Sequence, residues 1–146
     1  QVGANVDEVL YGLTEATSRQ PLMAEAWVNL GVLLQQNNEL KQALKCYQTA
    51  ARVAEGSSKA LPLYNVGAML LRAEDLPRAH GAFLAARRAD PKLAVATDGA
   101  GSVYLRKGAT KTAQAFFQEA LALQPDLAES YFNLGSIERG RGNWKR

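Results

Sequence analysis

A short pattern that contains an aromatic residue and ends in asparagine, an apolar residue and glycine returns along the chain at a nearly constant interval. It reads WVNLG up to Gly31, LYNVG up to Gly67 and YFNLG up to Gly135. The first interval is 36 residues and the second is 68, which is twice 34. The stretch TDGAG, which ends at Gly101, stands where the missing copy belongs but carries Gly99 in place of asparagine. Self-similarity at such a period predicts a solenoid of stacked supersecondary units.

Further positions repeat in the same frame and indicate that each unit is a pair of helices. Within both halves of a unit, apolar residues recur at the three- and four-residue spacing of one helix face. Turn-forming stretches, QNNEL, AEDLP and KGATK, separate the two halves. Pro91 and Pro125 stop the second helix, because proline cannot continue one. The repeated small and aromatic positions of the second half are Ala43, Ala79 and Ala113; Tyr47, Phe83 and Phe117; and Ala50, Ala86 and Ala120.

In these positions the chain resembles the tetratricopeptide repeat (TPR) family, whose unit is 34 residues long. The resemblance implies an all-α fold, a right-handed α-solenoid of stacked antiparallel helix pairs with a concave groove. We expect complete units at residues 24–59, 60–93 and 94–127. Residues 1–23 are expected to form the second helix of a preceding unit or an N-terminal cap, and residues 128–146 the first helix of an incomplete unit.

Two places depart from this regular plan. The first unit runs two residues long through AEGSSKALP, which predicts either an extended second helix or a longer loop. At the end of the chain, Trp144 stands where the family often places the aromatic residue that opens a second helix. Leu134 and Ile137 are expected to lack part of their cover there. A half unit at each end suggests a segment of a larger chain or complex.

The sequence contains few residues or motifs that could form a catalytic or a cofactor-binding site. His80 and Cys46 are the single residues of their types, and we expect packing or surface roles for both rather than a zinc site. The glycine-rich stretch that begins at Gly99 lacks the Gly-Lys-Ser/Thr of a phosphate-binding loop. We therefore expect no enzyme activity, no catalytic residues, no cofactor and no metal.

Charge and hydropathy limit the classes of partner and the compartment that the sequence predicts. The net charge of +3 comes from 17 basic and 14 acidic residues, and four of the basic ones crowd into the last eight positions. Such a tail is not the basic face of a nucleic-acid binder, so no nucleic acid is expected. No apolar run approaches the roughly 18 residues of a membrane span. A single cysteine favours a reducing compartment, the cytoplasm, although a targeting segment removed before Gln1 remains an alternative.

The resemblance places the binding surface on the first helix of each unit, which lines the groove in this family. Asn29, Asn65 and Asn133 share one position, and a carboxamide can pair with both the N–H and the C=O of a peptide. This series is similar to the asparagine ladder of long superhelical members, although such residues also tie adjacent helices together. The expected groove residues are Asn29, Val32, Gln36, Tyr64, Asn65, Ala68, Arg72, Asp98, Ser102, Arg106, Phe132 and Asn133.

This surface has two further features, an interruption of the asparagine ladder and a row of arginines. Gly99 interrupts the ladder, which we interpret as drift in a tolerant repeat, with close approach of a ligand backbone or a flexible joint as the functional alternative. Acidic residues stand near the starts of the first helices, and Arg72, Arg106 and Arg139 near their ends, so the arginines form a basic rim. The pattern does not fit the carboxylate clamp of chaperone-binding members, since only Asn65 matches.

The expected function is therefore a noncatalytic protein–protein interaction scaffold that binds a peptide segment of a partner protein in its groove. Two alternatives stay open. The chain is a substrate-recognition segment of a larger enzyme, such as a glycosyltransferase, or a structural subunit of a multiprotein assembly.

Overall fold

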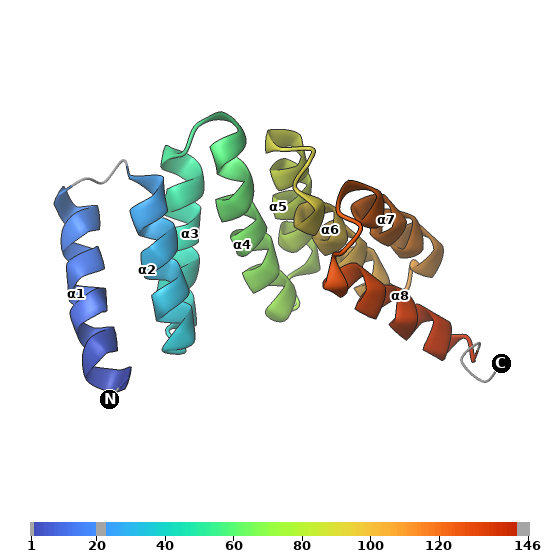
Figure 1. Ribbon diagram of the computed structural model, residues 1–146, viewed down its shortest axis with the longest axis horizontal. Helices are drawn as coiled ribbons and strands as arrows, with labels where there is room; N and C mark the ends of the chain where they lie inside the picture. The colour runs from blue at the N-terminus through green and yellow to red at the C-terminus, as the bar shows by residue number, and fades with distance from the viewer. Residues whose placement is uncertain (1, 20–22, 143–146) are drawn as a thin grey trace.

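The computed structural model describes residues 2–19 and 23–142 of the chain, and these residues form an all-α right-handed solenoid. Figure 1 shows the helices following one another along the long axis in the order of the sequence. Among the described residues there is no strand. The helices are α1 (Val2–Arg19), α2 (Ala24–Gln36), α3 (Leu40–Val53), the 3-10 helix η1 (Gly56–Lys59), α4 (Ala60–Arg72), α5 (Leu76–Ala89), α6 (Ala94–Arg106), α7 (Thr110–Leu123) and α8 (Ala128–Gly140).

Three hairpins of similar construction make up the stack, α2 with α3, α4 with α5 and α6 with α7. The first helices of neighbouring hairpins pack directly on one another, α4 on α6 and α6 on α8. On the opposite side, α5 and α7 are joined by the side-chain ion pair between Arg87 and Glu119 at 2.8 Å. The inner face formed by α2, α4, α6 and α8 is called the concave surface below.

The turn inside each hairpin uses one residue in the left-handed region. Asn38 has φ 65°, Glu74 has φ 59° and Gly108 has φ 82°. The next amide then reaches back to the carbonyl near the helix end, as the Glu39 N–H does to Leu34 at 2.8 Å and the Asp75 N–H to Leu70 at 2.9 Å. This bond satisfies a carbonyl that the helix end would otherwise leave unpaired.

Glycine is needed inside the first helices because an aromatic ring of the same hairpin lies against it. A β-carbon placed on Gly31 would meet the ring of Tyr47 at 2.6 Å, and one on Gly67 would meet Phe83 at 2.8 Å. Gly101 and Phe117 repeat this contact at 2.7 Å. The three rings are at most 2% exposed. The recurring pattern of the sequence is therefore the signature of one close helix contact, made once in each hairpin.

The two extra residues of the first unit lie in a linker, so the longer loop is correct and the extended helix is not. The second helices α3, α5 and α7 all have 14 residues. Helix α3 ends at Val53, Ala54 is extended, and the chain then forms η1 before α4 begins. The Lys59 ammonium donates to the Ala51 carbonyl at 2.9 Å, which fastens this linker to the end of α3.

The interpretation of Gly99 as drift is wrong, because a neighbouring ring excludes a side chain at this position. A β-carbon there would lie 2.4 Å from the ring of Phe83, closer than at any other glycine of the described chain. Phe83 belongs to the preceding hairpin and is 1% exposed. Its ring therefore lies between Gly67 of its own hairpin and Gly99 of the next, and it leaves no room for a side chain at either position.

The last helix is partly covered. Ile137 is 5% exposed and packs with Phe117 and Ala113, whereas Leu134 is half-buried. Gly135 differs from the equivalent glycines, because nothing lies within 4 Å of a β-carbon placed on it. Trp144 lies outside the described residues. Within the part of the chain that the structure describes, no helix has the length and apolar character of a membrane span.

Candidate functional site

The twelve expected groove residues all lie on the first helices, and they differ in accessibility. Phe132 is the most exposed large apolar residue among them, at 69%. Asp98, at 8%, is buried. The other exposed members are Asn29, Val32, Gln36, Arg72 and Arg106, and the half-buried ones are Tyr64, Asn65, Ala68, Ser102 and Asn133.

Four of the twelve meet in one cavity on the concave surface, where α6 faces α8. It has a volume of about 440 Å³. Asp98 and Ser102 come from α6, and Phe132 and Asn133 from α8. Glu129 and Ala128 complete the lining. Glu129 is one of the acidic residues that the sequence places near the start of a first helix, but the small Ala128 carries no signal that could have identified it. We call this cavity the α6–α8 pocket.

Asp98 holds the two helices of this pocket together. The Ser130 hydroxyl donates to Asp98 Oδ1 at 2.7 Å, and the Asn133 amide donates to the same oxygen at 3.2 Å. Ser130 is fully buried. Burial raises the pKa of the Asp98 carboxyl, the hydrogen bonds from Ser130 and Asn133 lower it, and the nearby Glu129 raises it further, with a net rise. Burial, and then the charges of Asp98 and Glu129, raise the pKa of Tyr64, which places that phenol beside the same acidic region.

The three asparagines of the expected ladder are therefore not equivalent. The Asn133 amide is committed to Asp98, so this residue ties α8 to α6. Asn29 is exposed and Asn65 is half-buried, and neither makes a side-chain hydrogen bond within the described residues. Two carboxamides of the concave surface are thus available to a ligand, at one-unit spacing on α2 and α4.

The basic rim is also uneven. The Arg106 guanidinium forms an ion pair with Glu74, which is the left-handed residue of the preceding turn. Arg139 donates to the Ser136 hydroxyl at 3.2 Å. Arg72 is exposed and forms no ion pair within the described residues. Of the three rim arginines, Arg72 therefore presents the charge that a ligand carboxylate can reach with least competition.

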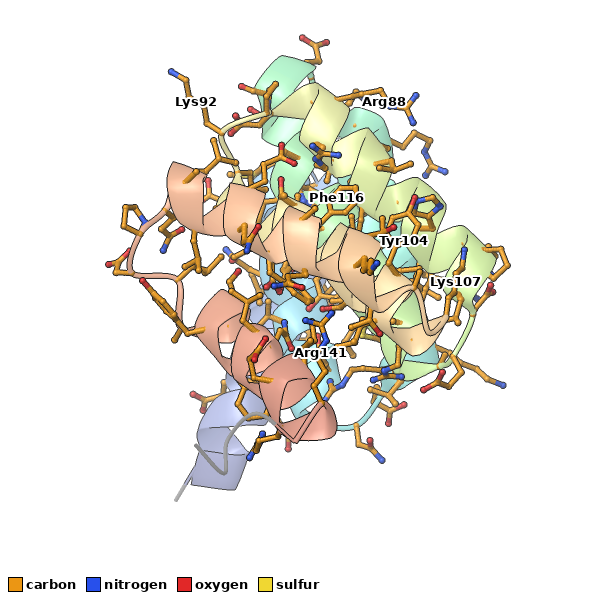
Figure 2. All side chains as sticks on the ribbon, turned by 90° about the vertical axis from the view of Figure 1, so that its right-hand side faces the viewer. Arg88, Lys92, Tyr104, Lys107, Phe116 and Arg141 are labelled. Carbon is orange, nitrogen blue, oxygen red and sulfur yellow. The ribbon has the colours of Figure 1, made fainter. Side chains whose placement is uncertain are left out.

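The outer side of the stack carries a chain of aromatic contacts between α5, α6 and α7. His80 meets Tyr104 edge-on at 5.1 Å between ring centroids, and Tyr104 stacks on Phe116 at 5.2 Å. Arg87 lies over the Phe116 ring at 5.0 Å, and the Lys107 ammonium is 5.9 Å from the Tyr104 ring. Figure 2 shows Phe116, Tyr104 and Lys107 in a row beside α7. The contacts give His80 a packing role at the edge of its hairpin. Cys46 is buried.

Comparison with known proteins agrees with this architecture. Residues 24–56 match one family model described as tetratricopeptide repeat, and residues 69–128 match a second one of the same description. The chain belongs to the tetratricopeptide repeat family. Proteins with TPR units are in general noncatalytic interaction modules that bind protein partners. The chain is accordingly a protein–protein interaction scaffold in this broad sense.

Solved structures share the TPR fold at low sequence identity. The crystal structure of MamA is 17% identical with a TM-score of 0.79, and the match covers 97% of this chain and 81% of MamA. A chain of the APC/C hetero-tetramer Cut9–Hcn1 is 22% identical with a TM-score of 0.80, over 92% of this chain and 26% of that one. YrrB, described as a TPR protein with an unusual peptide-binding site, is 18% identical with a TM-score of 0.71, over 97% and 72%. At these identities the likeness concerns the fold alone.

Proposed function

We propose that the chain binds an extended peptide segment of a partner protein along its concave surface. The observation that carries this proposal is the α6–α8 pocket, which combines a cavity of about 440 Å³ with an exposed phenylalanine, Phe132, and an exposed carboxylate, Glu129. An exposed ring beside a concavity loses water-contacting apolar area when a ligand covers it, and this favours binding. The pocket therefore supplies an anchor for one apolar side chain of the segment.

The remainder of the surface supplies contacts to the peptide backbone. Asn29 and Asn65 each offer a donor and an acceptor, and neither is committed within the described residues. They stand on successive first helices, so an extended segment that leaves the α6–α8 pocket can pass both of them. That YrrB is described as having a peptide-binding site supports the same use of the fold.

Panning of a phage-displayed random peptide library on the purified chain tests the proposal. We expect enriched peptides whose affinity falls in the variants Asn29→Ala and Asn65→Ala by about 0.5–1.5 kcal/mol each, the usual net worth of a hydrogen bond. Phe132→Ala should cost more, because it removes the apolar anchor. Gln118→Ala, on the exposed side of α7, is the matched control and should bind like the parent.

One outcome of the same experiment would contradict binding on the concave surface. If enriched peptides bind the three concave variants as tightly as the parent and lose affinity only through substitutions on α3, α5 or α7, the concave surface is not the binding site.

A further inference from the structure

A second cavity lies at the edge of the stack, between the turn that follows α2 and the end of α4. Its volume is about 480 Å³. Leu44, Met69 and Leu70 give it apolar walls, and the exposed Lys41 and Arg72 stand at its mouth. It shares no lining residue with the α6–α8 pocket. We call it the α2–α4 notch.

The contact between the next two repeats, where α4 and α5 meet α6, contains a place equivalent to the α2–α4 notch. There the space is filled by side chains of the chain itself. One repeat further along the chain, His80 replaces Leu44, Tyr104 replaces Leu70 and Lys107 replaces Ala73. The Tyr104 ring contacts His80 at 5.1 Å and is stacked on Phe116, so aromatic side chains fill this place. Figure 2 labels Tyr104 and Lys107 at this closed junction.

The arginine at the closed junction is neutralised from within the chain. Arg106, which corresponds to Arg72, pairs with Glu74. At the α2–α4 notch the residue that corresponds to Glu74 is Asn38, which carries no charge. Arg72 has no ion pair within the described residues, and Lys41 adds a second positive charge beside it. The notch therefore lacks two things that its counterpart has, a ring and a carboxylate.

We propose that the α2–α4 notch is a docking site for an apolar–acidic segment of a partner protein. In this segment an aromatic side chain enters against Leu44, Leu70 and Ala73, and a neighbouring glutamate pairs with Arg72. The shape of the cavity and the charge at its mouth are both complementary to this pair of side chains. The site lies outside the α6–α8 pocket, so it stands or falls independently of the peptide contact proposed there.

The capped dipeptide N-acetyl-phenylalanyl-glutamate amide is a suitable probe, titrated into the ¹⁵N-labelled chain and followed by amide chemical shifts. We expect saturable shifts at residues 40–44 and 70–73. The glutamine analogue should bind about three- to tenfold more weakly, because it loses a charge-assisted contact to Arg72. The alanyl-glutamate analogue should also be weaker, because it has no ring to fill the cavity.

A substitution that gives Arg72 an internal partner should close the site. Glu74 tolerates φ 59°, so the Asn38→Glu variant, at φ 65°, places a glutamate in a backbone conformation that the chain already uses for one. We expect Asn38→Glu and Arg72→Gln each to lower the affinity for the phenylalanyl-glutamate probe to that for the glutamine analogue. Gln42→Glu introduces the same charge at an exposed position of α3 outside the notch lining, and should retain most of the affinity at physiological salt.

Three results would overturn the proposal: no shifts at residues 40–44 and 70–73 up to the solubility limit of the probe, equal affinities for the glutamate and glutamine dipeptides, or unchanged affinity in Arg72→Gln. Phe132→Ala separates the two binding proposals. It should leave the dipeptide titration unaltered while it weakens the library peptides of the concave surface.

Discussion

The Gly99→Ala substitution is expected to destabilise the chain, although it replaces glycine in the middle of a helix. The added β-carbon would lie 2.4, 2.5 and 2.8 Å from three atoms of the Phe83 ring. Carbon atoms in favourable contact are about 3.5–4.0 Å apart, so the ring or the helix must shift by about 1 Å. The Phe83 ring has little space to move away from Gly99. On its other side lies Gly67, where a β-carbon would be only 2.8 Å from the ring, and the Tyr64 ring packs on it with 5.8 Å between the ring centroids.

Two opposing terms set the magnitude. Overpacking of a well-filled core costs about 1–3 kcal/mol. Alanine is favoured over glycine in a helix interior by about 1 kcal/mol, which offsets part of that cost. The expected net loss in the free energy of unfolding is therefore up to about 2 kcal/mol. Gly81→Ala, in the exposed middle of α5 with nothing within 4 Å of its β-carbon, is the matched control, and it should gain up to about 1 kcal/mol.

Urea unfolding followed by circular dichroism measures both variants. The double variant Gly99→Ala with Phe83→Leu should recover part of the loss relative to the sum of the single effects, because the smaller side chain makes room for the new methyl group. If Gly99→Ala raises the unfolding midpoint as much as Gly81→Ala does, Phe83 does not lie against Gly99 and our explanation of the interrupted ladder is refuted.

Further predictions concern buried polar groups and the turns. Asp98→Ala should cost about 1–3 kcal/mol, because the buried Ser130 hydroxyl loses its acceptor, whereas Asp98→Asn keeps an acceptor and should cost less in urea unfolding. The pKa of Asp98 in the folded state is raised above its ordinary value of 3.8. The contribution of Asp98 to stability is therefore largest below pH 3.8 and declines as the pH rises through the folded-state pKa. The Asp98→Asn variant should lack this dependence when unfolding midpoints are compared across pH. Burial, and then Lys107, lower the pKa of His80 below its ordinary 6.5, so the parent should lose stability relative to His80→Leu as pH falls through 6.5. Gly108→Ala should lower the free energy of unfolding by about 1–2 kcal/mol in urea titrations, because φ is 82° there although the space around the β-carbon is open.

The sequence predicted the helix pairs well because each of them repeats one steric contact. A glycine on the first helix and an aromatic residue on the second stand at fixed spacing, and the structure shows that they touch in three hairpins. Every copy of the contact imposes the same residue types, so the pattern is visible without coordinates. The choice between a longer helix and a longer linker after Val53 could not be made in this way. The 3-10 helix η1 takes up the extra residues, and the local sequence does not distinguish this linker from a longer α3.

The contacts between units were harder to predict, since each of them is made only once. Phe83 excludes a side chain at Gly99 one hairpin away, and nothing in the local sequence of α6 reveals that ring. The Asp98–Ser130–Asn133 network is visible in the sequence as unusual residue types at two repeat positions. Asp98 stands where other units have Val28, Tyr64 and Phe132, and Ser130 where they have small or apolar residues. Two polar departures in adjacent units that face each other are a signal of mutual pairing, which column-by-column analysis overlooks.

The junctions between units, rather than the repeated positions, are where this scaffold can distinguish its partners. Within the three hairpins, the repeated glycine, alanine and aromatic residues are buried and identical in role, so they cannot tell one ligand from another. The three junctions differ: the first is an open notch beside Arg72, the second is closed by rings and an ion pair, and the third is bound together by Asp98. Gly99 and Asp98 are neighbours in α6 and face different hairpins, since one receives Phe83 and the other receives Ser130. We therefore expect that a shift of α6 forced by a methyl group at Gly99 also moves Asp98, so that Gly99→Ala weakens concave-surface binding, measured with the library peptides, as well as stability.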